Sequence, residues 1–547
     1  MSRYLFITNS GKVEDGGHVL NHELTTSLAR QGHEVHLLML GASEIERPGV
    51  VAHDVRDPGL PAQEESRIEA ALGRCRFPVD RVSVELAERF PLLDRTAKGL
   101  PTDPSAFTAV VGFGDVTGPA ALDIRSRFYP GAVAVNGITM DPEGLFKAID
   151  APELGASRIA AHRATFAGSD LLFAHGIKSE RDALRLTASH PGTETSTPVY
   201  SFLPGTRISD SPTWNGEGTM NVLMLGRMGD PNKGAVDTAM AVGELRSFEG
   251  RDITLTLRGV SSGDMDPLSD TMEQHVGPEW RTFVKVEPFT DSAEEKARSI
   301  HESHAMVMAT ESEAYGLAAN EYLAHGKPLL VAEGNGNGYA EVLKSWEGMP
   351  ETARRLVIDD SNTTNVRGSA IAPSDPAAPP VTGRHEAIKN AISDLHDHYD
   401  EYAHAARAAR EELRHYSPDD MARSIDKAVT ERHEGVVRHT RQTPDGGLRP
   451  THGHEVTAGL PEHLKGIALD PAPSEQRAAA DTGGSGPPSA DRAPTSAQPQ
   501  APSFLGKSTA TSSTGKADAG GEPPRRPPQH SSPGSVPQEK RSNSVSR

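Results

Sequence analysis

The chain has a single cysteine, Cys75, among 547 residues. One thiol excludes an intrachain disulfide, so the protein can fold in a reducing compartment. No apolar run approaches the length of about 18 residues that a membrane-spanning helix needs, and the first residues read as a strand rather than an export signal. These absences predict a cytoplasmic protein with no transmembrane segment, and they leave peripheral contact with a membrane open.

Positive charge is also scarce, because 56 Lys and Arg residues face 75 Asp and Glu residues, for a formal net charge of −19. General nucleic-acid binding depends on a basic surface, so this balance argues against a nucleic-acid partner. The same balance weakens the case for tight docking on anionic lipid.

Large apolar residues become rare towards the end of the chain. From about Thr443 the sequence is rich in Pro, Gly, Ser, Thr and Ala. A segment of this composition cannot bury enough apolar surface to offset the entropy cost of ordering its backbone. We therefore expect a disordered Pro/Gly/Ser-rich tail over residues 441–547.

The rest of the sequence divides into two halves that begin with the same pattern of strands, loop and helix. Residues 4–8 and 35–40 read as strands on either side of a helix that follows Gly16 and Gly17, while residues 221–225 and 253–257 flank a second glycine-bearing loop and helix. A Pro/Gly/Ser-rich interruption separates the halves. The pattern predicts an α/β protein with two Rossmann-like domains facing a cleft, over residues 1–205 and 206–440, with the last helices of the second domain before the tail.

The segment of residues 313–321 carries the strongest chemical signal. It follows an apolar strand, residues 305–309, and it places Glu313 on a loop and Glu321 about one turn inside the helix that the text predicts from Leu317. Ligands of open parallel sheets bind at the carboxyl ends of strands, where the next helix presents free N–H groups to an anion. The two acids are thus expected to face one ligand, although acids at a helix start also simply favour the helix dipole.

Four features together resemble the family 4 glycosyltransferases of the GT-B fold, which retain anomeric configuration and use nucleotide sugars. The features are the Gly16–Gly17 loop, the loop of residues 226–234 with its Arg and Lys, the pair of glutamates eight positions apart, and the glycine-rich residues 334–338 before Glu341. The resemblance covers residues 1 to about 435.

The resemblance implies a role for each matching residue. Arg227 and Lys233 would hold the donor diphosphate and balance the charge that grows as the nucleotide leaves. Glu313 would lie near the transferred sugar, and Glu321 would accept hydrogen bonds from the ribose. The assignment implies three catalytic residues and a wider donor-binding set: catalytic Glu313, Arg227 and Lys233; donor-binding Gly16, Gly17, Arg227, Lys233, Tyr315, Gly316, Leu317 and Glu321.

The acceptor side departs from the family. Histidines are usual at two places in the first domain, where this chain has Asp115 and Asn136 instead. These two residues and His18 are the candidates for acceptor or sugar contacts, and the acceptor is expected to carry a hydroxyl group. The departure also leaves open a catalytically impaired binding protein and a GT-B-shaped nucleotide-sugar epimerase.

Other clusters support weaker alternatives. Residues 112–118 contain the glycine spacing of a dinucleotide fingerprint, but they do not follow the first strand of the half, which disfavours an oxidoreductase. Asp264 and Asp266 lie in a Ser/Gly turn, and His396 and His404 share an ordinary polar helix face. We therefore predict no metal and no cofactor beyond the nucleotide-sugar co-substrate.

Overall fold

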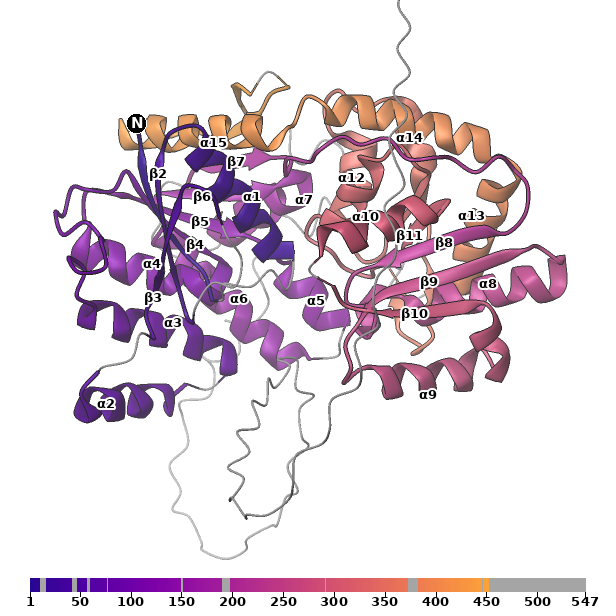
Figure 1. The fold of residues 1–547 in the computed structure, drawn as a ribbon, viewed down its shortest axis with the longest axis horizontal. Helices are drawn as coiled ribbons and strands as arrows, with labels where there is room; N and C mark the ends of the chain where they lie inside the picture. The colour runs from indigo at the N-terminus through magenta and orange to yellow at the C-terminus, as the bar shows by residue number, and fades with distance from the viewer. Residues whose placement is uncertain are drawn as a thin grey trace, which may run out of the picture. The chain divides into compact units, whose positions relative to one another are not determined.

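A computed structural model describes residues 1–9, 16–41, 47–56, 60–75, 77–148, 151–188, 197–290, 292–371, 382–444 and 446–451. These residues all belong to one compact unit. They form two large, almost wholly parallel sheets with helices packed on them and one small three-stranded sheet, in agreement with the predicted α/β class (Figure 1). The predicted tail beyond Thr451 lies outside the described residues.

The first sheet has the strand order β18-β17-β7-β6-β5-β4-β1-β2-β3, and every pairing in it except β17 with β18 is parallel. Its central strands, β1, β4, β5 and β6, read as nearly continuous apolar runs because helices cover both faces of the sheet. The strands are β1 Arg3–Ile7, β2 Glu34–Met39, β3 Val50–Asp54, β4 Ala109–Phe113, β5 Val133–Ile138, β6 Leu171–His175, β7 Val199–Phe202, β17 Thr440–Gln442 and β18 Leu448–Pro450.

The helices of the first sheet follow their strands, as a βαβ pattern requires. Leu20, Leu24 and Leu28 recur every four residues on the first helix and are buried against the sheet. These helices are α1 Gly16–Arg30, α2 Ala62–Leu72, α3 Pro78–Arg89, α4 Gly114–Phe128, α5 Pro142–Ala148, α6 Pro152–Ala167 and α7 Gly176–Ala188.

The second sheet has the strand order β10-β9-β8-β11-β12-β13 and is parallel throughout. The largest hydrophobic cluster of the described residues lies between this sheet and its helices. The elements are β8 Met220–Leu225, α8 Ala235–Glu249, β9 Ile253–Val260, α9 Met265–His275, β10 Val284–Pro288, α10 Ala293–Glu302, β11 Ala305–Met308, α11 Leu317–Leu323, β12 Leu329–Ala332, α12 Gly338–Ser345, β13 Val357–Ile358, α13 Arg384–Asp397 and α14 Tyr399–Leu413.

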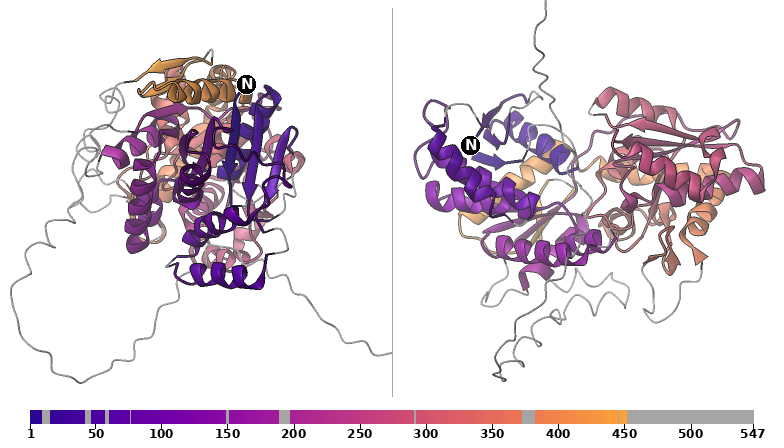
Figure 2. Two further views of the ribbon diagram at one scale, coloured as in Figure 1. Left: turned by 90° about the vertical axis from the view of Figure 1, so that its left-hand side faces the viewer. Right: turned by 90° about the horizontal axis from the view of Figure 1, so that it is seen from below.

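The chain returns to the first sheet at its last helix, α15, which spans Pro418–His433. Met421, Ile425 and Val429 of α15 are buried in the same cluster as the first-sheet strands, and α15 lies beside α1 (Figures 1 and 2). Strands β17 and β18 then extend this sheet. We call the first sheet with α1–α7, α15 and this hairpin the first lobe, and the second sheet with α8–α14 the second lobe.

This return differs from the predicted domain ranges, which assigned residues 418–440 to the second domain and residues 441–451 to the tail. The apolar period of α15 shows that one face is buried, but the sequence does not say which sheet buries it. Thr440 and Gln442 are buried next to β7, so strand pairing orders a stretch whose composition resembles that of the tail.

Candidate active site

Two loops meet at the carboxyl edge of the second sheet. Strands β8 and β11 are paired in parallel, so the loops that follow them leave the sheet side by side. The first loop carries Lys233, and its ammonium lies 2.7 Å from Oε2 of Glu313 on the second loop. The two side chains are 16% and 24% exposed, so this ion pair is within reach of a ligand.

Asn232 fastens the two loops to each other. Its side-chain amide donates to the Ser312 carbonyl oxygen at 3.0 Å and accepts from the Ser312 N–H at 3.0 Å. The Asn232 carbonyl also accepts from the Glu311 N–H at 2.8 Å. Because Asn232 is buried, these bonds fix the positions of Lys233 and Glu313 before any ligand arrives.

Arg227 lies on the same loop as Lys233 and is the more exposed of the two cations. Its side chain is 55% exposed, and its closest described acid is Asp230, at 3.8 Å between Nη2 and Oδ2. The guanidinium therefore has donors available for an anion. The structure brings Arg227, Lys233 and Glu313 to one edge of one sheet, as the sequence predicts.

Gly316 turns the chain into helix α11. Its φ is +102°, and a Cβ at this position would lie 2.8 Å from Cε of Met308. Only glycine fits this close approach without strain. The helix starts at Leu317, and Glu321 follows one turn later, half-exposed, with Lys296 Nζ at 4.0 Å.

Tyr315 contributes packing rather than a side-chain contact with a ligand. Its ring is buried edge-on against Tyr339, with centroids 5.5 Å apart, and burial raises the pKa of its hydroxyl. Only the backbone of Tyr315 is therefore available to contact a ligand.

The glycine-rich loop before Glu341 is tied to the same acidic segment. The Glu313 N–H donates to the Gly336 carbonyl at 3.3 Å, and the Gly338 N–H donates to the Glu313 carbonyl at 3.0 Å. Glu341 itself accepts two bonds of 2.8 Å from Arg181 of α7 in the first lobe. The ion pair between Arg181 and Glu341 thus joins the two lobes next to the segment that carries Glu313.

A buried lysine of the first lobe completes this junction. Lys178 places its ammonium 2.7 Å from Asp141 and 2.8 Å from Asp182, and the same Asp141 oxygen accepts from Oγ of Ser312 at 2.8 Å. Burial alone would lower the pKa of Lys178 and raise that of Asp141, but the mutual attraction reverses both shifts. The network holds the residue next to Glu313 from the opposite lobe.

This network was not predicted from the sequence. The four-residue spacing of Lys178 and Asp182 signals an ion pair on one helix face. Nothing in the sequence places Asp141 or Ser312 beside that pair, because these residues lie on separate loops.

The predicted first-lobe contacts lie in different settings. Gly16 and Gly17 form the first residues of α1, and the loop of residues 10–15 before them lies outside the described residues. His18 is buried, with Nε2 2.6 Å from Oδ1 of Asn9. The structure therefore places His18 in the first turn of α1, and its predicted acceptor role stays a prediction.

Asp115 and Asn136 lie inside the first lobe. The Asp115 carboxylate lies 2.6 Å from Nε of Arg158 and 3.5 Å from Nδ1 of His162. Burial raises the pKa of this carboxyl group. Asn136 is buried beneath α4, where its Nδ2 would be 2.1 Å from a Cβ on Gly118. Among the described residues, no hydrogen bond or ion pair joins either side chain to the loops that carry Lys233 and Glu313.

A second buried ion pair lies beneath the Lys233 loop. Arg384 is fully buried, and its Nε donates to Asp360 at 2.7 Å. One of its terminal nitrogens would lie 3.0 Å from a Cβ on Gly234. The guanidinium therefore supports the loop from below, and Gly234, with φ of +68°, leaves room for it.

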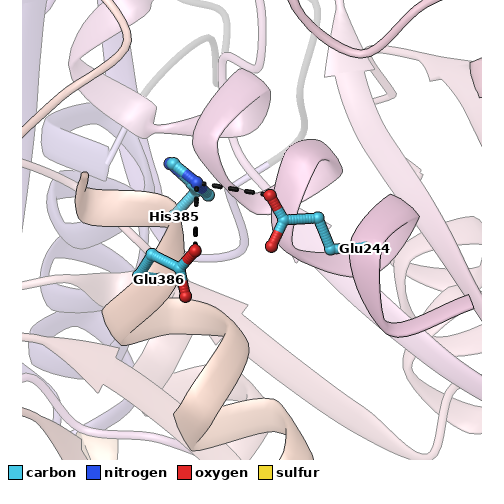
Figure 3. A group of neighbouring side chains, drawn as sticks. All are labelled: Glu244, His385 and Glu386. Atoms are coloured by element: carbon cyan, nitrogen blue, oxygen red, sulfur yellow. Dashed lines mark ion pairs between the residues drawn. The ribbon is translucent and has the colours of Figure 1, made fainter. Parts of the chain in front are cut away.

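Within the described ranges, one group of side chains has the spacing of metal ligands: Glu244, His385 and Glu386, on α8 and α13 (Figure 3). Lys389 lies 2.9 Å from Glu244 and 2.6 Å from Glu386. The ammonium already balances both carboxylates, so a metal ion would have to displace it. None of these three residues lies on the loops that follow β8 and β11.

A hollow of about 290 Å³ lies along β9, β10 and α10, lined by residues such as Thr254, Lys285 and Ser303. It contains none of the predicted site residues. We assign the site by the convergence of charged side chains at the sheet edge and not by this hollow.

The chain matches a family model described as Family 4 Glycosyltransferase in conflict systems over residues 5–425. No curated protein matches the sequence. Among the part of the chain that the structure describes, no helix has the length and apolar character needed to cross a bilayer.

Solved structures share the fold. Sucrose-phosphate synthase from Thermosynechococcus elongatus is 15% identical, with 80% of this chain and 100% of that chain covered and a TM-score of 0.57. An E. coli trehalose-6-phosphate structure bound with UDP-2-fluoro glucose is 12% identical, with 80% and 100% covered and a TM-score of 0.51. A trehalose-phosphate synthase from Burkholderia xenovorans in complex with glucose-6-phosphate is 12% identical, with 78% and 100% covered and a TM-score of 0.50.

Proposed function

Because the chain belongs to the family 4 glycosyltransferases in conflict systems, we propose that it transfers a sugar from a nucleoside diphosphate sugar to a hydroxyl acceptor with retention of configuration. One observation carries the proposal. An ammonium and a carboxylate, Lys233 and Glu313, meet at 2.7 Å on adjacent loops at the carboxyl edge of a parallel sheet, where ligands of this fold class bind.

The diphosphate of the donor is bound by the two cations of the first loop. The exposed guanidinium of Arg227 contacts phosphate oxygens through a planar pair of N–H groups, and the ammonium of Lys233 acts as a point charge. Lys233 exchanges part of its contact with Glu313 for the phosphate. Since Asn232 fixes both loops, little reorganisation is needed when negative charge grows on the leaving group.

The sugar and ribose are bound by the second loop. Glu313 accepts a hydrogen bond from a hydroxyl of the transferred sugar, and Glu321 accepts from the ribose. Backbone N–H groups after Gly316 point from the start of α11 towards the phosphate, and the helix dipole favours the anion.

The reaction then breaks the bond between the anomeric carbon and the phosphate oxygen, and the electron pair passes to the diphosphate. The acceptor oxygen bonds to the anomeric carbon on the face that the leaving group vacates, and its proton passes to the departing diphosphate. Arg227 and Lys233 stabilise the charge that appears in this step, so the proposal involves no metal or further cofactor.

The donor class has support from proteins of the same fold. One of these structures is bound with UDP-2-fluoro glucose, which is a nucleotide sugar. We extend this class, a nucleotide sugar as donor, to the present chain on the strength of its Arg227, Lys233 and Glu313 arrangement.

The test begins with thermal shift of the full chain against UDP-, GDP- and ADP-sugars, because a bound ligand raises Tm according to its affinity. We expect one nucleotide class to raise Tm for the wild type and the control Lys427→Ala, but not for Lys233→Ala. Equal shifts for all three proteins would overturn the donor site. The anomeric proton signal of the product, followed by NMR with an acceptor panel, decides between retention and inversion.

The burial of Asp115 and Asn136 favours a second candidate, a protein that binds the donor but does not transfer the sugar. Such a protein would show the same thermal shift without product formation. Release of sugar-acceptor product from the panel would exclude it, and conversion of the nucleotide sugar with no acceptor present would indicate an epimerase.

A further inference from the structure

A solvent-open hollow of about 510 Å³ lies where the two lobes are connected. Three segments line it: the connection between β7 and β8, the joint between α14 and α15, and the end of α1. Each segment contributes one arginine, Arg207, Arg414 and Arg30 respectively. The hollow is of the size that proteins use for small ligands.

The hollow carries excess positive charge in a chain whose formal net charge is −19. Arg207 is exposed, and no described acidic side chain lies within ion-pair distance of it. Arg30 pairs with Asp419, which is the only acid among the lining residues, and Arg414 pairs at 2.6 Å with Glu411 outside the lining. Arg30 and Arg414 thus each have one carboxylate partner, and Arg207 has none among the described residues.

The N-terminal end of α15 also lines the hollow. Ser417 and Pro418 at the start of this 16-residue helix line the hollow, so its positive dipole end points there. Ser417 Oγ is already used, because it accepts from the Asp420 N–H at 3.2 Å. The first turn of α15 also carries Asp419 and Asp420, which oppose the helix dipole, so the arginines supply the donors that can bind an anion.

The three segments form one rigid support. The Thr206 N–H donates to the Tyr416 carbonyl at 3.3 Å, and a Cβ on Gly205 would lie 2.3 Å from the Pro418 nitrogen. Gln31 donates to the Asp419 carbonyl at 2.6 Å, which holds the end of α1 against the same joint. The arginine-bearing backbone is thus held in place before a ligand binds.

The hollow is distinct from the proposed donor site. Arg30 is the last residue of α1, and Gly16 at the donor end is the first, so about 20 Å of helix separates them. Neither Lys233 nor Glu313 lines the hollow.

We propose that this hollow is a binding site for a phosphate-bearing small molecule, separate from the donor site. Arg207, Arg414 and Arg30 grip the phosphate group, and the remaining volume accommodates the organic part. Because the ligand touches both connections between the lobes, its binding restrains their relative movement. The inference stands independently of the proposed transfer reaction.

Calorimetric titration of the full chain with inorganic pyrophosphate at low salt tests the proposal. We expect two sites per chain in the wild type. Arg207→Ala with Arg414→Ala should weaken one site roughly tenfold or more, given the strength of charge-assisted hydrogen bonds, and leave the other unchanged. Arg227→Ala with Lys233→Ala should do the reverse, which separates this site from the donor site.

The matched control is Arg67→Ala with Arg354→Ala, which removes the same charge from two exposed, ion-paired positions elsewhere. It should keep both sites. The single variant Arg207→Ala, which breaks no described ion pair, guards against a folding defect and should show the same weakening in smaller measure. Unchanged binding in the Arg207/Arg414 variant, or an equal loss in the control, would overturn the proposal.

Competition identifies the source of the phosphate. If AMP or glucose 6-phosphate displaces pyrophosphate from the site that depends on Arg207, the ligand is a phosphate ester. If neither competes with pyrophosphate there, the site does not take an organic phosphate and the proposal is wrong.

Discussion

The two lobes place charge at the carboxyl edges of their sheets in opposite ways. In the second lobe, Lys233 and Glu313 meet at a partly exposed position, with Arg227 in solvent beside them. In the first lobe, Asp115 is paired with Arg158 and buried. The same strand-loop-helix construction thus presents charge to a ligand in one lobe and uses it for packing in the other.

Two lysines show the difference most directly. Lys178 of the first lobe is buried between Asp141 and Asp182, whereas Lys233 of the second lobe has one carboxylate partner and some exposure. We infer that the first lysine serves stability and the second serves binding. The following substitutions test this division, from the largest expected effect to the smallest.

Lys178→Met should lower the free energy of unfolding by about 3–5 kcal/mol, because it leaves two buried carboxylates without their cation. Urea denaturation measures the change. The exposed Lys427→Met is the control and should change stability by less than about 0.5 kcal/mol. A loss below about 1 kcal/mol for Lys178→Met would show that the network contributes little to stability.

Lys233→Ala should lower kcat by about 10²–10³-fold, the usual effect of removing one preorganised group that stabilises a leaving anion. Its urea midpoint should stay close to that of the wild type, because the side chain is partly exposed. The measurement is initial-rate product formation with the donor found by thermal shift. If Lys233→Ala lost stability but kept its turnover, Lys233 would serve stability and not binding.

His175, at the end of β6, should make the first lobe sensitive to acid. Burial lowers its pKa to about 3, whereas the unfolded chain has the ordinary value near 6.5. The unfolded state binds more protons between these values, so stability falls as pH falls, by about 1.4 kcal/mol per pH unit for this group.

His175→Leu should remove that contribution. Urea denaturation at pH 7 and pH 5 measures the slope, and the exposed His404→Leu serves as control. An unchanged slope for His175→Leu would mean that the pKa of His175 is not lowered in the folded protein.

Asn136→Ala should have the smallest effect on donor binding. Its side chain makes one long hydrogen bond, Nδ2 to the Gly114 carbonyl at 3.4 Å, inside the first lobe. We expect a stability loss of about 1 kcal/mol and a donor Kd within about twofold of wild type. A larger change in Kd, measured by calorimetry, would show that Asn136 takes part in donor binding despite its burial.

Much of the fold was predictable from the sequence. Apolar strands such as residues 221–225 and 329–332 are bounded by glycine loops and periodic helices, and the two-sheet α/β class is confirmed. The return of α15 to the first lobe was not predictable, because an amphipathic period defines a buried face without naming the surface that covers it.

For the candidate site, the sequence itself determined the chemistry of the second lobe. Gly316 permits the sharp entry into α11, and Glu321 lies about one turn inside that helix while Glu313 stays on the loop before it. Only the tertiary structure decided which groups are exposed: it buried Asp115 and Asn136, paired Lys178 across to Ser312 through Asp141, and gathered three arginines at the lobe connection. The physical reason is that local backbone geometry is written in neighbouring residues, whereas burial and charge pairing arise between segments that are distant along the chain.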